Sequence, residues 1–408
     1  MKDKYSIKTN KVSLNKRDSK KVALIHDWFL KNSIGGAEKV TFLVDKILTE
    51  NFSLPDIFSI TENISNTKNY FNKKRKLNTT FIQKLPFGKN NVQYYLPLIP
   101  FAIEQIDLRN YDLIISSSHL ASKAVLTNPD QLHISYVHTP MRYAWDQMNT
   151  YIESSKISKL GFEIFIRYLL YKLRQWDFQT GYRPDYLIAN SSFTARRIKK
   201  YWGLNSTVIH PAINTKRFKF KENREDFYLS VNRLVPNKRI DLLIKSFNKL
   251  NLPLYVVGNG SEYKKLQKIS NKNIKLLGNQ PDYIVENLMS KCRAFVYSGI
   301  EDFGIAPVEA MASGAPIIAL GKGGILDTVS CITKSSDAVY PTGVLFNNQS
   351  IQDIFDTISW FEEKKVWKNF DPVVLNHLSN KFSEENFSKN FMNFTHKAIE
   401  EFSLRKIF

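Results

Sequence analysis

Two cations, Arg233 and Lys238, stand five residues apart in the stretch VNRLVPNKRID. The apolar run before Arg233 predicts a strand and the apolar periodicity after Lys238 predicts a helix, so one connecting loop carries both side chains. Two fixed cations at this spacing suit a diphosphate, and they can stabilise a phosphate leaving group in place of a metal ion. A solvated basic loop without a ligand is the alternative interpretation.

Two carboxylates, Glu301 and Glu309, bracket the stretch EDFGIAPVE. Glu301 follows a predicted strand, and Pro307 marks the start of the helix that carries Glu309. Carboxylates and helix N-terminal amides in this arrangement can bind the vicinal hydroxyls of a ribose or a hexose. The segment therefore predicts a sugar-nucleotide site, with Glu301, Phe303, Gly304, Ile305 and Glu309 as its candidate residues.

Two further loops hold candidate residues. Gly35 and Gly36 lie between a predicted strand and a predicted helix, where the backbone can approach a phosphate closely; a simple turn is the alternative. His138 follows another predicted strand, and the Thr-Pro turn after it favours an exposed cleft position; a core histidine is the alternative. Arg142 and Asp146 in the same loop are candidates for binding an acceptor.

Strand-loop-helix units must position these residues, and they occur in two series. The first series predicts strands at 21–28, 111–118, 133–140 and 185–192, and the second at 227–234, 252–260, 274–279, 293–299, 315–320 and 343–346. Alternating strands and helices predict an α/β protein with two Rossmann-like, doubly wound parallel-sheet domains that face an inter-domain cleft. The first strand is not followed by G-x-G-x-x-G, which argues against a dinucleotide oxidoreductase.

The expected organisation has four parts. They are a disordered basic tail at 1–20, a first domain at 21–208, a second domain at 209–385, and a C-terminal helix at 386–408 that crosses back to the first domain.

The chain is basic, and the charge is uneven. Among 408 residues, 58 Lys and Arg stand against 38 Asp and Glu, a net charge of +20, and residues 1–208 hold 31 of the basic and 17 of the acidic side chains. No motif typical of nucleic-acid binding is present, so nucleic acid is not an expected partner. Residues 156–183 mix basic and aromatic side chains in an amphipathic pattern suited to an anionic membrane surface. A partly buried helix with a basic face is the alternative.

Several sequence features bear on the location of the protein. The first twenty residues lack the apolar segment of a secretory signal, and no apolar run is long enough for a transmembrane helix. Two cysteines, Cys292 and Cys331, cannot form a disulfide framework, which favours a reducing compartment. We expect a cytoplasmic protein that is peripheral on the inner face of the cytoplasmic membrane.

The order of these motifs resembles that of the retaining glycosyltransferases of family 4, which have the GT-B fold. The resemblance covers residues 21–400 and rests on Gly35-Gly36, YVHTPMRYAWD, LIANSSFTARRI, VIHPAINTKRF, Arg233 with Lys238, and Glu301 with Glu309. HTPMRYAWDQ and SVNRLVPNKRIDL look most like bacterial GDP-mannose-dependent mannosyltransferases of O-antigen and surface-polysaccharide synthesis. Asp327 in GGILD stands where the family often has a glutamate.

The resemblance implies roles for the donor-site residues. Arg233 and Lys238 would bind the donor diphosphate and neutralise it as it leaves. Glu309 would hold the ribose, and Glu301 would hold the transferred sugar together with the amides near Phe303 and Gly304. The loop of Gly35 and Gly36 would close over the phosphates, and His138 would lie beside the anomeric centre or the acceptor. Asn190 and His210 are interpreted as structural or inter-domain residues.

The resemblance also implies a reaction and partners. The reaction would move mannose from GDP-mannose to a glycan or lipid-linked oligosaccharide acceptor, with retention of configuration. No cofactor and no metal are expected, since the nucleotide sugar is a substrate and no D-x-D motif is present. A UDP-glucose or UDP-galactose donor is the nearest alternative. A non-catalytic nucleotide-sugar-binding protein and a nucleotide-sugar epimerase are alternatives of other classes.

Overall fold

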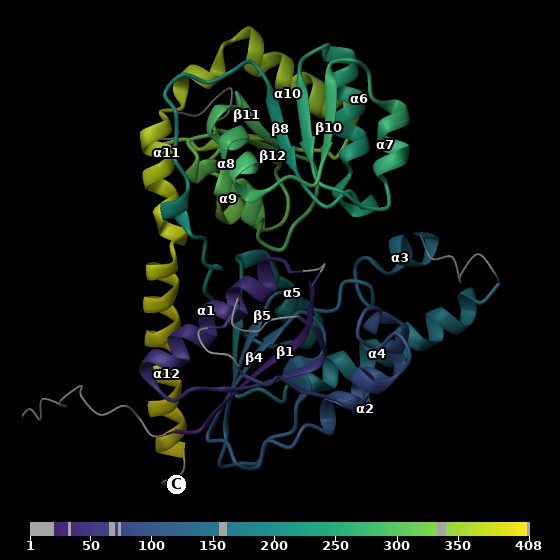
Figure 1. The fold of residues 1–408 in the computed structure, drawn as a ribbon, viewed down its shortest axis with the longest axis vertical. Helices are drawn as coiled ribbons and strands as arrows, with labels where there is room; N and C mark the ends of the chain where they lie inside the picture. Colours follow the sequence, from purple (N-terminus) through teal and green to yellow (C-terminus); the bar gives the residue numbers. More distant parts are fainter. Residues whose placement is uncertain are drawn as a thin grey trace, which may run out of the picture.

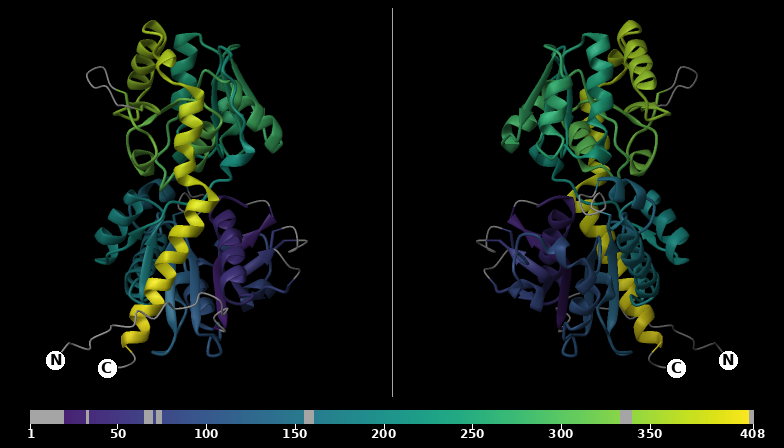
Figure 2. Two further views of the ribbon diagram at one scale, coloured as in Figure 1. Left: turned by 90° about the vertical axis from the view of Figure 1, so that its left-hand side faces the viewer. Right: turned by 90° about the vertical axis from the view of Figure 1, so that its right-hand side faces the viewer.

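A computed structural model describes residues 20–31, 34–64, 70–71, 75–154, 161–332 and 340–405. The predicted disordered tail at 1–20 therefore lies, apart from Lys20, outside the described residues. Two α/β domains stand end to end, and the C-terminal helices run beside them, with α11 Pro372–Ser379 along the second domain and α12 Glu384–Arg405 along the first (Figures 1 and 2). The prediction of two doubly wound parallel-sheet domains is confirmed.

The first domain contains a seven-stranded parallel sheet with the order β3-β2-β1-β4-β5-β6-β7. Its strands are β1 Val22–Leu30, β2 Asp56–Asn63, β3 Asn78–Thr79, β4 Leu113–Ser118, β5 Leu132–Val137, β6 Tyr186–Ala189 and β7 Thr207–Val208. Its helices are α1 Gly36–Asn51, α2 Ile99–Glu104, α3 Met148–Ser154, α4 Glu163–Thr180 and α5 Ser192–Trp202, with 3-10 helices η3 Phe81–Lys84, η4 Val92–Leu98 and η5 Ser122–Ala124. Strand β1 is almost wholly buried, as is typical of a parallel strand covered by helices on both faces.

The second domain contains a six-stranded parallel sheet with the order β10-β9-β8-β11-β12-β13. Its strands are β8 Tyr228–Val231, β9 Leu254–Val257, β10 Ile274–Gly278, β11 Ala294–Tyr297, β12 Ile317–Leu320 and β13 Gly343–Phe346. Its helices are α6 Ile240–Leu250, α7 Tyr263–Ile269, α8 Asp282–Lys291, α9 Ile305–Ala312, α10 Ile351–Glu363 and α11 Pro372–Ser379, with 3-10 helices η7 Thr215–Arg217, η8 Pro236–Lys238, η9 Gly324–Asp327, η10 Val366–Asn369 and η11 Asn380–Phe382. Every strand that the sequence predicts in this half is present.

The direction of winding reverses at one point in each sheet, between β1 and β4 and between β8 and β11. Loops that leave the carboxyl ends of two such strands turn to opposite faces of the sheet, and ligands of doubly wound proteins bind in the crevice between them. Gly35 follows β1, His119 follows β4, Arg233 follows β8 and Glu301 follows β11. The topology therefore positions candidate residues at both switch points.

The C-terminal helix α12, Glu384–Arg405, follows the second domain in sequence but packs on the first (Figure 2). Its buried residues Phe387, Phe391 and Ala398 belong to the apolar core that also contains Leu24 of β1 and Val44 of α1. Residues far apart in sequence therefore build one face of the first domain.

Candidate functional site

The loop of Gly35 and Gly36 opens helix α1 and faces the second domain. The backbone N–H of Gly35 donates to Glu38 Oε2 at 2.8 Å, which is the half of a capping box that a glycine N-cap can form. A Cβ atom on Gly36 would overlap Cδ1 of Ile305, at the start of α9. Any side chain at position 36 would force Ile305 to move, so the two predicted loops meet closely across the domain boundary.

His138 lies at the end of a chain of hydroxyl groups behind that loop. Because the carbonyl oxygen of Ala37 can only accept, the Thr41 hydroxyl donates to it at 2.9 Å. Thr41 Oγ1 then accepts from Ser117 Oγ at 2.7 Å, and Ser117 Oγ accepts from Nε2–H of His138 at 2.8 Å. With the Thr41 proton on the Ala37 carbonyl oxygen, this arrangement corresponds to the tautomer that carries its proton on Nε2.

The predicted exposure of His138 is wrong. The residue is 8% exposed, since its ring packs on Tyr136 with 5.1 Å between centroids and its Nε2 faces Ser117. Burial lowers the pKa of His138 to about 3, and the neighbouring His26 and His119 contribute to that lowering. The imidazole is therefore neutral at pH 7, and it can exchange hydrogen bonds with a ligand but adds no positive charge.

Asp27 is a site residue that the sequence interpretation missed. Its buried carboxylate accepts the backbone N–H groups of four successive residues, His119 to Ser122, at 2.7–2.9 Å. These residues form the loop after β4, so Asp27 fixes both strands at the switch point of the first sheet. An aspartate within a buried strand was the available signal, because a buried carboxylate requires partners.

The predicted diphosphate cations lie on the facing loop of the second domain. Lys238 forms an ion pair with Glu301 and contacts the hydroxyl of Tyr297 at 3.3 Å. Tyr297 also donates a hydrogen bond to Glu301. Arg233 is exposed. The burial of His119 in the first domain lowers the pKa of that histidine, and the positive charge of Arg233 lowers it further. Arg233, Lys238 and Glu301 therefore share one region, with Arg233 near enough to the first domain to act on His119.

Glu301 is anionic in this environment. Burial would raise its pKa, but Lys238, Arg142 and the hydroxyl of Tyr297 hold the pKa below its ordinary value. The Oε1 atom of the carboxylate is bound by one cation, Lys238, and one phenol, Tyr297, and the carboxylate can accept further hydrogen bonds from ligand hydroxyls.

The segment after Glu301 combines a buried anchor with a special backbone conformation. Phe303 is 3% exposed, and its ring packs against His210 and Phe382 at centroid distances of 5.6 and 5.5 Å. Gly304 has φ of 94°, a region that favours glycine, and it caps helix α9. Phe303 therefore anchors the loop with its side chain, while the backbone of Gly304 and Ile305 begins the helix.

Glu309 lies on α9 and faces Arg217, with 3.4 Å between Oε1 and Nη2. Arg217 also pairs with Asp282 and Glu286. Burial raises the pKa of Glu309, and Lys39 of the first domain and Arg217 oppose that shift. The structure therefore separates the two predicted glutamates: Glu301 contacts Lys238, and Glu309 contacts Arg217.

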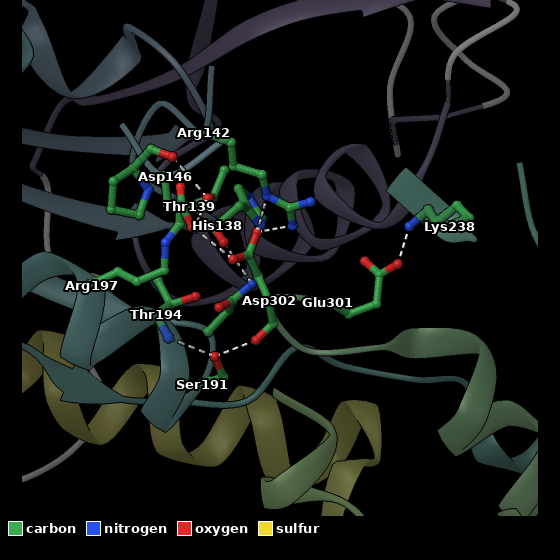
Figure 3. Close-up of polar contacts among 12 residues, drawn as sticks. His138, Thr139, Arg142, Asp146, Ser191, Thr194, Arg197, Lys238, Glu301 and Asp302 are labelled. Atoms are coloured by element: carbon green, nitrogen blue, oxygen red, sulfur yellow. Dashed lines mark hydrogen bonds and ion pairs between the residues drawn. The ribbon is translucent and has the colours of Figure 1, made fainter. Parts of the chain in front are cut away.

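The acceptor candidates Arg142 and Asp146 both take part in ion pairs. Arg142 pairs with Asp302 of the second domain, and Asp146 pairs with Arg197 of α5 at 2.7 Å (Figure 3). Asp302 and Arg197 are further site residues that the sequence interpretation missed. No local signal could have revealed them, because their partners lie in another domain or another loop.

Asn190, His210 and Asp327 lie at the domain boundary. Asn190 Nδ2 donates to the carbonyl oxygen of His138 at 2.9 Å. Asp327 accepts from the backbone N–H of Ser192 at 2.6 Å and contacts His210 Nε2 at 3.1 Å. Burial would raise the pKa of Asp327, but these contacts hold it below its ordinary value. Asp327 thus joins the second domain to the N-terminus of α5.

Two features are absent from the described part of the chain. Among the residues outside the gaps, no three His, Cys, Asp or Glu side chains group as metal ligands would. Within the same residues, no helix has the length and apolarity that a membrane span requires.

Family models match both domains. Residues 64–217 match the model described as Glycosyltransferase Family 4, and residues 212–377 match the model described as Glycosyl transferases group 1. The two matches follow each other across the domain junction.

The curated relatives include several mannosyltransferases by name. The alpha-1,3/1,6-mannosyltransferase of Kluyveromyces lactis is 25% identical over 71% of this chain and 66% of its own length. A GDP-mannose-dependent phosphatidylinositol monomannoside mannosyltransferase of Corynebacterium glutamicum is 27% identical over 38% of this chain and 49% of its own. The O-antigen chain mannosyltransferase of Salmonella typhimurium is 30% identical over 31% of this chain and 40% of its own. The chain thus spans less than two thirds of each.

Solved structures share the fold. The Anabaena protein HepE in complex with UDP and glucose superposes with a TM-score of 0.64 at 15% identity, over 92% of this chain and 99% of that one. At this identity the likeness concerns the fold alone.

Proposed function

Since the chain belongs to the family 4 glycosyltransferases, we propose that it transfers mannose from GDP-mannose to a lipid-linked glycan acceptor of surface-polysaccharide synthesis, with retention of configuration. The observation that carries the proposal is the meeting of two switch points. Gly35 and Gly36 face Ile305 across the boundary, and Lys238 and Glu301 lie on the adjoining loops of the second domain. This arrangement brings helix N-termini, cations and a carboxylate to one place.

The proposed chemistry exchanges one bond at the anomeric carbon. The bond from that carbon to the β-phosphate oxygen breaks, and a bond to the acceptor oxygen forms on the same face. The departing phosphate takes the proton of the acceptor hydroxyl. Arg233 and Lys238 stabilise the charge that develops on the diphosphate, and Glu301 orients the sugar hydroxyls. In the tautomer with its proton on Nε2, neutral His138 can accept a hydrogen bond from a ligand through Nδ1.

The names of the relatives support mannose, and the name of one of them supports GDP-mannose. A UDP-sugar donor is the alternative, and it is tested because the solved neighbour with the same fold is in complex with UDP and glucose. A panel of GDP-mannose, UDP-glucose and UDP-galactose, with a membrane extract as acceptor source, separates them. We expect GDP-mannose to be consumed and to raise the melting temperature most, since a ligand at 100 times its Kd stabilises by about 2.7 kcal/mol. Stabilisation without consumption would favour a binding protein, and sugar interconversion without transfer would favour an epimerase.

Chelation is expected to leave transfer unchanged. If Arg233 and Lys238 neutralise the diphosphate, the reaction needs no divalent ion at that position. The measurement is the initial rate with millimolar EDTA against the rate with added Mg²⁺ or Mn²⁺. An absolute requirement for either ion would contradict the assignment of the two cations.

An aromatic surface on the first domain supports peripheral membrane attachment as part of the proposal. It consists of the exposed residues Tyr94, Leu98 and Phe101 of η4 and α2, and Ile164, Phe165, Tyr168 and Tyr171 of α4. The two parts adjoin, since Trp176 of α4 donates to Glu104 of α2 at 3.2 Å. Aromatic side chains interspersed with cations suit the interface of an anionic bilayer.

Helix α4 is partly buried, as the alternative interpretation of residues 156–183 expected, and contact with a membrane is the part that we propose; residues 156–160 lie outside the described residues. One face, with Leu170 and Leu173, packs on the domain, and the other carries the aromatic surface. Arg174 is partly buried, and its Nε donates to the carbonyl oxygen of Ala144 at 2.7 Å. Lys172 is exposed and lies over the ring of Tyr168.

The double substitution Tyr168→Ser with Lys172→Gln is expected to weaken binding to anionic vesicles, since it removes apolar area and charge from the aromatic surface. The matched control is Tyr283→Ser, which alters an exposed tyrosine of the second domain. Co-sedimentation with phosphatidylglycerol vesicles measures binding, which should also fall with salt because charges are screened beyond about 10 Å at 0.1 M. Equal binding to neutral and anionic vesicles would count against the membrane proposal.

A further inference from the structure

Asp302 of the second domain forms ion pairs with two arginines of the first domain, Arg142 and Arg197. Its Oδ2 accepts from Arg142 Nε at 2.8 Å and from Nη2 of the same guanidinium, and its Oδ1 accepts from Arg197 Nη1 at 2.8 Å. Arg142 lies in the loop after β5, and Arg197 lies on α5. Figure 3 shows the carboxylate between the two arginines. One acidic side chain therefore bridges two elements of the opposite domain, and these three residues, Arg142, Asp302 and Arg197, are called the latch below.

The latch carries one excess positive charge, which the partly exposed Asp146 balances. The side chains of Asp302 and Arg197 are 7% and 6% exposed. Arg197 also donates to Asp146 Oδ1 at 2.7 Å and to Thr139 Oγ1 at 2.6 Å. Two arginines and two aspartates sum to zero charge only while the domains are together. Separation leaves one excess positive charge on the first domain and an unpaired aspartate on the second, so it exchanges charged hydrogen bonds between the domains for contacts with water.

A backbone contact strengthens the link at the same residue. Ser191 Oγ, which caps α5 by accepting the N–H of Thr194 at 3.0 Å, donates to the carbonyl oxygen of Asp302. Both the side chain and the main chain of Asp302 are thus held by the first domain. The preceding residue is Glu301, whose carbonyl oxygen accepts the N–H of Gly324 at 2.8 Å.

We propose that Asp302 is a positioning residue that couples closure of the two domains to the placement of Glu301. When the domains close, Arg142 and Arg197 bind Asp302 and fix the loop from which the carboxylate of Glu301 projects toward Lys238. When they open, that loop loses its partners on the first domain. The consequence for sugar transfer rests on the proposed function, whereas the coupling itself does not.

This role differs from the acceptor binding expected of Arg142 and Asp146. Each of these side chains already has an oppositely charged partner, Asp302 for the first and Arg197 for the second. Their place in the loop after His138 puts the latch beside the proposed anomeric site, so closure and sugar placement occur together.

The test is Asp302→Asn, which keeps the size of the side chain and removes its charge. The matched control is Asp226→Asn, because Asp226 pairs with Arg293 within the second domain. Small-angle X-ray scattering without ligand should show a larger radius of gyration for Asp302→Asn than for the wild type and for Asp226→Asn. Turnover of GDP-mannose should fall about a hundredfold, as misplaced reacting groups cause, while the Kd for GDP stays near the wild-type value.

Two further variants keep the test decisive. Arg142→Gln removes one of the two partners of Asp302, and it should act in the same direction if Asp302→Asn does not fold. Asp302→Asn combined with Arg142→Gln should cost little more than Asp302→Asn alone, because among the described residues Arg142 donates its hydrogen bonds to Asp302, so both changes break the same contact. Wild-type scattering and wild-type turnover in Asp302→Asn would overturn the proposal. If the wild type consumes none of the nucleotide sugars, the proposed function fails, and scattering still decides whether the latch closes the domains.

Discussion

Glu301→Gln is expected to lower turnover about ten- to a hundredfold and to leave the affinity for GDP near that of the wild type. The transferred sugar gains positive charge as its bond to phosphate breaks, so hydrogen bonds to an ionised carboxylate strengthen at that moment. Glu301 is held ionised by Lys238 and Arg142, and glutamine keeps its shape without the charge. The substitution therefore reduces kcat more than it reduces the affinity for GDP.

Glu309→Gln is the matched comparison. The proposed ribose contact is common to GDP and GDP-mannose, so this variant should weaken both alike. The Kd for GDP is measured by calorimetric titration, and kcat is measured in parallel, for each of the two variants. Equal losses of GDP affinity in Glu301→Gln and Glu309→Gln would show that the two carboxylates act as one nucleotide clamp, and the division of roles would be wrong.

Asp27→Asn is expected to destabilise the fold by about 2–6 kcal/mol, the cost of leaving two buried donors unpaired. Four backbone N–H groups converge on the two oxygens of Asp27. Asparagine offers one oxygen, and its NH₂ group faces N–H donors that it cannot satisfy. Denaturant unfolding of the two proteins measures the difference. The control is Asp107→Asn, an exposed partner of Arg109 whose loss should leave stability unchanged.

The effect of Asp27→Asn should depend on pH with a definite sign. Burial would raise the pKa of Asp27, but the imidazoles of His119 and His26 and the backbone N–H groups lower it below the ordinary value. The unfolded chain therefore binds the proton more readily, so the stabilisation is present above about pH 4 and is lost as the pH falls. A stability difference that grows toward acid pH would contradict this account.

The sequence predicted the elements of the second domain better than those of the first. Each strand after residue 220 is a short, mostly apolar run between turn residues, which is the clearest strand signal. Strand β2 was missed because its buried positions include Ser59 and Thr61, so no continuous apolar run marks it. In the sequence alone, a segment with serine and threonine looks like a loop, because nothing in it shows that a sheet buries these hydroxyl groups.

The site was predictable only where chemistry and local structure coincide. Arg233, Lys238 and Glu301 lie in loops that join a strand to a helix. The sequence of each such loop is enough to predict that its residues lie at the end of a parallel strand. Asp302 and Arg197 belong to the site because they form an ion pair between the two domains. No local sequence pattern predicts a contact between residues of different domains. The buried state of His138 has the same origin, since Ser117 comes from a neighbouring strand and packs against it.

The return of α12 to the first domain has a consequence for synthesis on the ribosome. Phe387, Phe391 and Ala398 complete the core that begins with Val22 and Leu24, yet they are translated after the entire second domain. One apolar face of the first domain therefore stays exposed while the second domain is synthesised and folds. Nascent chains stalled before residue 384 should bind chaperones that recognise apolar surface, and should release them once the last helix has left the exit tunnel.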